Sequence, residues 1–203
     1  MRHEVAEEYP LAAGAFARIL REQREMQLKG GIYHLTQIAM AYNSNRIEGS
    51  ALSVEQTWYL YERRTVLGEA PLNDVVETSN HFRAFDVMLD RVGEPNTAES
   101  IKEYHRILKS GTQDAEKDWF AVGDWKKLVN EVGGIATTPP SEVQQEINSL
   151  VTGTPAEMTF GDVCDFHVRF EQIHPFQDGN GQIGRLILFE QCLWPTGTCR
   201  LWC

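Results

Sequence analysis

Apolar residues recur at helical spacing on both sides of a short polar segment near the C-terminal end of the chain. This pattern predicts two buried helices joined by a tight loop. The two apolar sets are Val163, Phe166, Phe170 and Ile173, then Ile183, Leu186, Ile187, Phe189 and Leu193. The segment between them, residues 174–185, reads His-Pro-Phe-Gln-Asp-Gly-Asn-Gly-Gln-Ile-Gly-Arg. Pro175 should end the first helix, because proline disfavours helical geometry in the preceding residue and cannot donate a backbone hydrogen bond.

The same periodicity predicts further helices upstream. A charged amphipathic helix is expected over residues 10–29, ending at Gly30-Gly31, and a second from about Tyr33 to Tyr42. Polar start signals mark the later helices. These signals are Ser53 with Gln56 (for a helix to about Arg64), Asn73 or Asp74, Thr97 with Ser100, Ser141 with Gln144, and Thr154-Pro155 for the helix that leads to His174.

The helical period disappears between Asp118 and Pro140. Residues 127–129 and 135–137 flank a Gly-Gly pair, which predicts two short strands joined by a glycine turn. An ordinary surface hairpin explains this segment as well as a functional one does. The expected fold class is all-α, a helical bundle around a helix-loop-helix with a small β-hairpin.

Composition narrows the function classes. The chain has 203 residues with 42% hydrophobic content, enough for one domain with a real core. A net charge of -10 argues against a nucleic-acid groove or an anionic membrane surface, because both need clustered Lys and Arg. No transmembrane span or signal peptide is recognisable, and Cys164, Cys192, Cys199 and Cys203 form no Cys-x-x-Cys pair. We therefore expect a cytoplasmic protein with reduced thiols.

The loop itself carries chemistry suited to a phosphate. Gly179, Asn180 and Gly181 allow successive backbone N–H groups to converge at the start of the second helix, where the helix dipole also favours an anion. His174 adds an imidazole and Asp178 a carboxylate that suits a hard cation. Taken singly, a histidine after a helix is usually a cap and Asp-Gly is usually a turn. Together they predict a phosphate site.

This loop resembles the signature of the Fic family, His-Pro-Phe-x-Asp/Glu-Gly-Asn-Gly-Arg-x-x-Arg, and differs at one fixed position. Gln182 stands where the family has its first arginine. Members usually transfer AMP from ATP to a protein hydroxyl. The resemblance implies His174 as the general base, Asp178 as the Mg²⁺ ligand and Phe176 as the loop anchor. It implies that the nucleotide contacts are Gly179, Asn180, Gly181, Gln182, Gly184 and Arg185, with Arg185 on the γ-phosphate.

A second motif lies upstream. Ser44-x-x-x-Glu48-Gly49 is similar to the inhibitory motif Ser/Thr-x-x-x-Glu-Gly/Asn of self-restraining Fic proteins. By itself, Glu48 reads as a surface charge at a helix end. In the family this glutamate pairs with the second arginine, here Arg185, and takes the place of the γ-phosphate, because an arginine engaged by a carboxylate cannot also receive phosphate oxygens.

The resemblance also suggests a partner. In the family a β-hairpin flap lies at this point of the sequence and holds the target segment by strand addition. The corresponding residues are Val132, Gly133, Gly134 and Ile135. The expected partner is a protein with a Ser, Thr or Tyr hydroxyl, the chain itself included, and neither nucleic acid nor membrane. A homodimer is left open.

Three regions are expected: an N-terminal helical extension (1–32), a Fic domain (33–193) with the inhibitory helix at about 33–49, and an atypical tail (194–203). Two alternatives to AMP transfer remain. One is a de-AMPylating hydrolase in which Glu48 aligns a water. The other is a non-catalytic nucleotide-binding module, favoured by Gln182 and by a tail without helical period. A helical interaction protein that binds no nucleotide is a more distant alternative.

Overall fold

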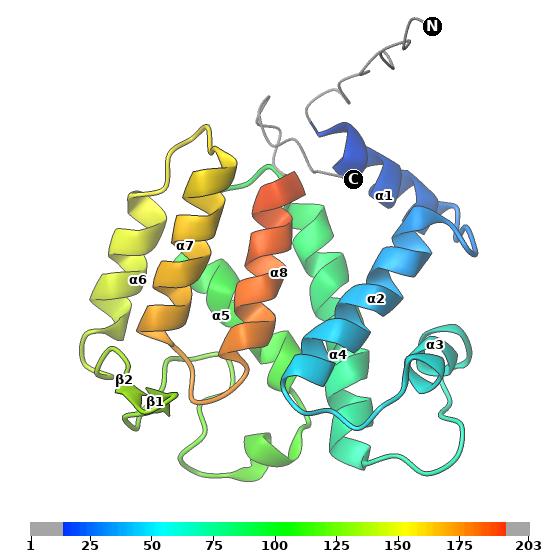
Figure 1. Cartoon of the computed structure of the whole chain (residues 1–203), viewed down its shortest axis with the longest axis horizontal. Coiled ribbons are helices and arrows are strands. Elements are labelled where there is room, and N and C mark those ends of the chain that lie inside the picture. The colour runs from blue at the N-terminus through cyan, green and yellow to red at the C-terminus, as the bar shows by residue number, and fades with distance from the viewer. Residues whose placement is uncertain (1–13, 194–203) are drawn as a thin grey trace, which may run out of the picture.

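The structure is a computed structural model that describes residues 14–193. This part of the chain is helical with one small antiparallel sheet, which confirms the all-α class (Figure 1). The elements in order are α1 (Ala15–Glu25), α2 (Ile32–Ile47), α3 (Val54–Arg63), α4 (Leu72–Arg91), α5 (Ala98–Lys109), a 3-10 turn (Gln113–Glu116), β1 (Glu131–Val132), β2 (Ile135–Ala136), α6 (Val143–Thr152), α7 (Phe160–Ile173) and α8 (Asn180–Leu193).

Helix α8 lies at the centre of the bundle. It pairs with α7 and also contacts α2, α4 and α5. The main core is built from fully buried apolar side chains of these helices, among them Phe85, Met88, Tyr104, Phe170 and Ile183. The loop between α7 and α8, the hairpin and the C-terminal end of α2 all lie at one end of the molecule (Figure 1). Chain segments far apart in sequence are thereby brought to one site.

Helix starts with a strong local signal were predicted correctly. Ser53 caps α3 and Thr97 caps α5, each in a reciprocal capping box with the residue three positions on. Two other starts were wrong. Helix α6 begins after Glu142 without any side-chain cap. Helix α7 begins after Thr159, in a capping box with Asp162, while Thr154 instead donates to the Leu150 carbonyl at the end of α6.

The first two helices end at places that differ from the prediction. Helix α1 stops at Glu25, not 29, because Gln27 takes a left-handed conformation (φ 50) and the Leu28 N–H bonds the Gln23 carbonyl. The predicted start at residue 10 lies outside the described residues. Helix α2 continues past the predicted end at Tyr42 to Ile47, close to the end at about residue 49 expected for the inhibitory helix.

The hairpin is shorter than predicted. Only Glu131 with Ala136 and Val132 with Ile135 pair across the Gly133-Gly134 turn, both glycines having positive φ. Residues 127–129 were predicted as a strand and are not one. Backbone groups at this end of the segment instead bond to the loop after α7: the Lys126 N–H reaches the Pro175 carbonyl and the Leu128 N–H reaches Gln177 Oε1.

No helix of the described residues is long and apolar enough to cross a membrane. Cys164 carries a free thiol. The tail at 194–203, with Cys199 and Cys203, lies outside the described residues.

A histidine on α4 is fully enclosed by the bundle. His81 is 2% exposed, and neither of its ring nitrogens has a hydrogen-bond partner among residues 14–193. Burial, with the charge of Arg185 nearby, lowers the pKa of His81 from 6.5 to about 4. The unfolded chain therefore takes up a proton that the folded chain excludes. The stability that this group contributes is complete above pH 6.5 and is lost as the pH falls towards 4.

Replacing His81 with Leu should flatten the pH dependence of stability in that window. The slope of the unfolding free energy should fall by up to ~1.4 kcal/mol per pH unit, because one titrating group is removed and no hydrogen bond is lost. Urea unfolding at a series of pH values would measure both slopes. Equal slopes for the two proteins would show that the imidazole titrates alike in both states.

Candidate functional site

The loop between α7 and α8 is anchored in the core. Phe176 is 0% exposed and its ring stacks on His105, with centroids 3.9 Å apart and 3° between the planes. His105 accepts a hydrogen bond from the Gly123 N–H at Nδ1, and its Nε2 lies 3.2 Å from the Asp178 carbonyl oxygen. Burial lowers the pKa of His105 to about 3, so this ring is neutral. The His105 ring therefore contacts the loop at two positions, by stacking on Phe176 and by a polar contact with the Asp178 carbonyl.

Asn180 closes the loop with its side chain. Its Oδ1 accepts from the Phe176 N–H at 2.7 Å and its Nδ2 donates to the Phe176 carbonyl at 2.8 Å. The residue is 2% exposed. Its amide is therefore occupied inside the loop, and only its backbone N–H is placed to face an anion. The sequence had suggested that Asn180 contacts a phosphate directly.

Backbone amides gather at the start of α8. Gly179 takes a left-handed conformation (φ 80), and the first helical bond runs from the Ile183 N–H to the Gly179 carbonyl. The N–H groups of the three residues between them, 180–182, precede that bond and have no acceptor within the helix. Their dipoles and that of α8 favour a negative charge here.

A carboxylate of the protein already lies on this turn. A Cβ built on Gly181 would be only 2.2 Å from Glu48 Oε1, so the carboxylate rests directly against the glycine. The same oxygen accepts from Arg185 Nη2 at 2.6 Å. Arg185 also donates to the Oγ and the carbonyl of Ser44, each at 3.0 Å. The Glu48 carboxylate, at the end of α2, thus lies against the first turn of α8 and is bonded to Arg185.

Gly49 makes this arrangement possible. It has φ 94, and a Cβ there would meet nothing within 4 Å, so conformation and not crowding favours glycine. The Gly49 N–H bonds the Arg46 carbonyl and the Ser50 N–H bonds the Asn45 carbonyl, which is a Schellman ending of α2. The chain turns away directly after Glu48, and the side chain of Glu48 points back to α8.

His174 occupies the last position before the loop. It is left-handed (φ 50, ψ 62) and follows the end of α7. Burial lowers its pKa below the usual value, so the imidazole is neutral at pH 7 and can accept a proton. Its Nδ1 lies 3.9 Å from Glu171 Oε2, and burial raises the pKa of that carboxyl group.

Asp178 is paired with a lysine that the sequence did not single out. Lys109 Nζ lies 2.5 Å from Asp178 Oδ2 and 2.7 Å from Glu77 Oε1. Gln182 donates from Nε2 to the same Glu77 oxygen at 2.6 Å and to Asn45 Oδ1 at 2.9 Å. Glu77 and Lys109 lie in different helices far from the motif, and no local sequence signal marks them.

The charges of this cluster shift the pKa values of Lys109 and Asp178. Burial alone would lower the pKa of Lys109, but Glu77 and Asp178 raise it above its usual value. Burial likewise opposes the charge on Asp178, and Lys109 outweighs it, so the pKa of this carboxyl group is lowered. The ion pair therefore favours the charged forms of both Lys109 and Asp178.

The carboxylate of Asp178 is suited to act as a ligand of Mg²⁺. Its side chain is 54% exposed beside a cavity of about 180 Å³. No group of three or more His, Cys, Asp or Glu side chains within residues 14–193 could hold a metal alone. Mg²⁺ is usually held by one or two carboxylates, with water and substrate phosphates as the other ligands, and Asp178 suits that pattern.

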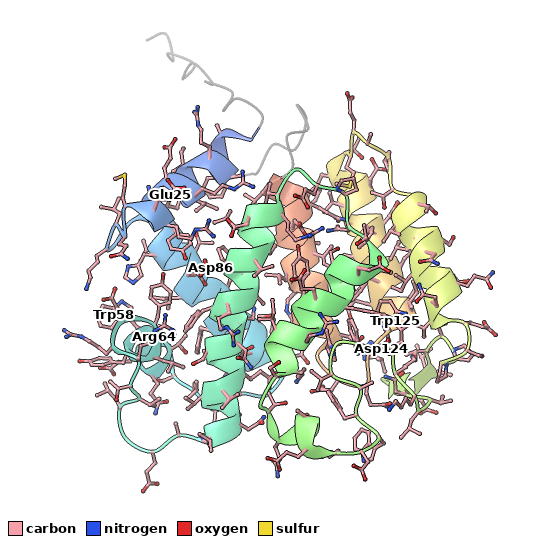
Figure 2. The ribbon with its side chains drawn as sticks, turned by 180° about the vertical axis from the view of Figure 1, so that it is seen from behind. Glu25, Trp58, Arg64, Asp86, Asp124 and Trp125 are labelled. Carbon is pink, nitrogen blue, oxygen red and sulfur yellow. The ribbon has the colours of Figure 1, made fainter. Side chains whose placement is uncertain are left out.

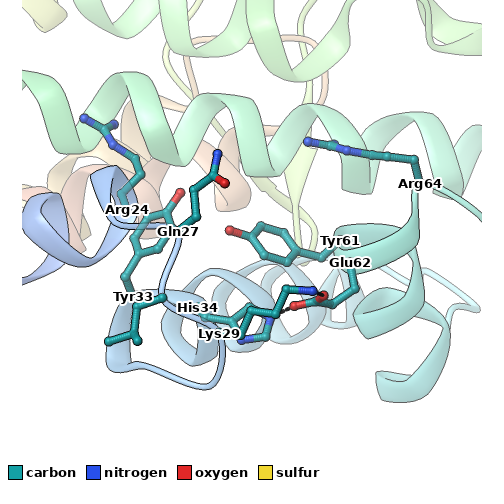
Figure 3. Close-up of a pocket in the computed structure, with 9 residues that line it drawn as sticks. Arg24, Gln27, Lys29, Tyr33, His34, Tyr61, Glu62 and Arg64 are labelled. Atoms are coloured by element: carbon teal, nitrogen blue, oxygen red, sulfur yellow. Dashed lines mark hydrogen bonds and ion pairs between the residues drawn. The ribbon is translucent and has the colours of Figure 1, made fainter.

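A larger cavity lies elsewhere. It has a volume of about 370 Å³ and lies between the α1–α2 turn and α3, where Arg24, Tyr33, Tyr61 and Arg64 are among its lining residues (Figure 3). None of its lining residues belongs to the loop or to α8. Its size alone therefore does not make it the chemical centre.

The hairpin is tied to the loop. Lys126 is 3% exposed and its Nζ donates to Asn130, Thr137 and the Ile173 carbonyl. Asn130 in turn donates to the Phe176 carbonyl. Beyond this base, the tip of the hairpin projects with Val132 48% and Ile135 74% exposed.

Comparison with known proteins agrees with this geometry. Residues 95–192 match the Fic/DOC family. The chain is 23% identical over 155 residues to a protein named protein adenylyltransferase Fic from Aedes aegypti, covering 72% of this chain and 30% of that protein. A probable protein adenylyltransferase of Aquifex aeolicus is 43% identical over 53 residues, which are 25% of this chain and 17% of that protein.

The fold is also similar to those of solved Fic-domain structures. A Fic domain containing signaling protein from Bacteroides thetaiotaomicron superposes with a TM-score of 0.71 and 25% identity, over 87% of this chain and 72% of that one. The chain spans about a third of the length of the first curated relatives, 30% and 35%. With the helix-loop-helix, the sequence match and the shared architecture, residues 95–192 of this chain form a domain of the Fic/DOC family.

Proposed function

We propose that this chain transfers AMP from ATP to a hydroxyl group of a target protein and that Glu48 restrains the reaction. The observation that carries the proposal is the position of Glu48: its carboxylate lies on the amide-bearing turn of α8 and on Arg185. The guanidinium group that holds this carboxylate can hold a phosphate oxygen instead, and the amides of residues 180–182 lie on the same turn. The relatives named protein adenylyltransferases, matched over 72% of the chain, support the reaction class.

In the proposed reaction the target hydroxyl attacks the α-phosphate of ATP. An oxygen–phosphorus bond forms to the hydroxyl oxygen, the bond to the leaving pyrophosphate breaks, and the hydroxyl proton moves to His174. The neutral imidazole suits a general base, a role worth roughly 10²–10⁴ in rate. Mg²⁺ held by Asp178 would neutralise phosphate charge. The amides of residues 180–182 and Arg185 hold the phosphate oxygens as charge develops.

Autoinhibition is expected because Glu48 and the γ-phosphate would bind the same groups of the protein. While Arg185 binds Ser44 and Glu48, its donors are not available to the γ-phosphate. The Glu48 carboxylate also repels a triphosphate from the same turn. ATP therefore binds productively only when the end of α2 withdraws its glutamate.

The hairpin is proposed to hold the target. The exposed strands β1 and β2 offer a free edge for main-chain pairing, and Val132 and Ile135 offer apolar contacts. Attachment of the hairpin base to the loop at Phe176 and Ile173 would align a paired segment with His174. The target, whether another protein or a second copy of the chain, would supply a Ser, Thr or Tyr hydroxyl.

Replacing Glu48 with Gly should raise AMP transfer by at least about tenfold, because it removes one charge-assisted contact worth about 1.5–3 kcal/mol that competes with the nucleotide. Incorporation of α-labelled ATP into the chain or into lysate proteins would measure it. The same change combined with His174→Ala should give no incorporation. If the Glu48→Gly form binds ATP but transfers no label, the chain is a nucleotide-binding module, and if it releases AMP from adenylylated protein, it is the hydrolase.

Replacing Gln182 with Arg should tighten binding of ATP with Mg²⁺ by about tenfold or more, because a guanidinium adds charge-assisted donors at the phosphate site. Calorimetry on the Glu48→Gly form with and without the change would measure it. Equal dissociation constants would place residue 182 outside the phosphate site.

A further inference from the structure

Lys109 on α5 lies beside the first turn of α8. Gln182, the residue that departs from the family signature, lies in the same turn. A Cβ built on Gly179 would lie 2.8 Å from Lys109 Cε and 3.5 Å from Gln182 Oε1. The lysine stem and the glutamine side chain therefore approach one point of the loop from two helices. Gly179 leaves room for the lysine, because any side chain at this position would clash with it.

The side-chain N–H groups of Gln182 donate to other helices and not to the turn. Its Nε2 donates to Asn45 on α2 and to Glu77 on α4. Its Oε1 has no partner among the described residues, although the residue is 2% exposed. The side chain thus offers neither a charge nor a spare N–H group to a phosphate at this end of the turn.

Lys109 brings a charge to the place where Gln182 has none. Its side chain is 2% exposed, and its ammonium group joins Asp178, at the mouth of the site, to Glu77, which also receives the Gln182 amide. An ammonium group has three donors, and two acceptors are accounted for. Arg185 is instead bonded to Ser44 on α2.

We propose that Lys109 is the second phosphate-binding cation of this chain and supplies from α5 the positive charge that the family signature places at position 182. Glu77 keeps the ammonium group in position, and Asp178 shares it until a divalent cation and a nucleotide arrive. The inference rests on the proposed function, since it assigns a partner to the phosphates of the same nucleotide.

Three variants in the Glu48→Gly background test this assignment by calorimetry with ATP and Mg²⁺. Lys109→Met should weaken binding by about tenfold to a hundredfold, the loss expected for one charge-assisted contact. Adding Gln182→Arg to Lys109→Met should recover most of that loss, because a cation returns to the same turn. Adding Glu77→Gln to Lys109→Met should not recover it.

Lys102→Met is the matched control. Lys102 lies on the same helix and also pairs with a carboxylate, Asp124 at 2.6 Å, on the loop after α5 (Figure 2 labels Asp124). It removes one positive charge away from the turn, and binding should stay within about twofold of the parent. Thermal melting of each variant checks the fold. Lys109→Gln, which keeps a hydrogen-bonding side chain, should show the same weakening, so the test survives if Lys109→Met does not fold.

Two results would overturn the assignment. Unchanged binding by folded Lys109→Met or Lys109→Gln would show that the ammonium group does not act on the nucleotide. Recovery by Glu77→Gln would show that Lys109 only neutralises Glu77. If the Glu48→Gly parent itself binds no ATP, the proposed function fails, which is a different outcome from equal binding by parent and variant.

Discussion

Two hydrogen bonds between the side chain of Asn180 and the backbone of Phe176 fix the bend between α7 and α8. The bend carries the imidazole of His174, the carboxylate of Asp178 and the amides at the start of α8 within a few residues of chain. Groups this close in sequence act together only when the backbone between them is rigid. Phe176 stacks on His105 in the core, so buried contacts and not solvent-exposed ones keep the bend rigid.

The net charge of -10 is compatible with the proposed phosphate site. Exposed charges beyond roughly 8–10 Å are largely screened at physiological ionic strength, so the local groups decide. Locally, helix α8 contributes its amides and Arg185 a full positive charge, and Lys109, paired with Glu77 and Asp178, is the proposed second cation. The anion present at the turn, Glu48, belongs to the same chain and is therefore at high effective concentration. In the proposed mechanism, a free nucleotide must compete with this tethered carboxylate.

The motif residues that form the site were visible in the sequence because they are contiguous, and capping boxes at Ser53 and Thr97 located two helices by the same local logic. Failures came where distant contacts decide. Residues 127–129 had strand-like composition, yet Leu128 and the preceding Lys126 bond to the loop after α7. Lys109 and Glu77 join Asp178 and Gln182 across 69 and 105 positions of chain, and no pattern within a helix could reveal this.

Gln182, the residue that differs from the family signature, connects two motifs that are separate in the sequence: the loop before α8 and residues 44–48 at the end of α2. Its amide nitrogen donates to Asn45, which lies on α2 one residue after Ser44 and three before Glu48. Helix α2 is therefore attached to α8 at two points: Arg185 holds Ser44 and Glu48, and Gln182 holds Asn45. In the proposed mechanism, withdrawal of Glu48 strains both points, because they lie on adjacent turns of α8. A neutral side chain at position 182 makes the second attachment by hydrogen bonding alone. Restraint by α2 and the charge of the phosphate site are thus coupled through one residue, and any change there should alter both.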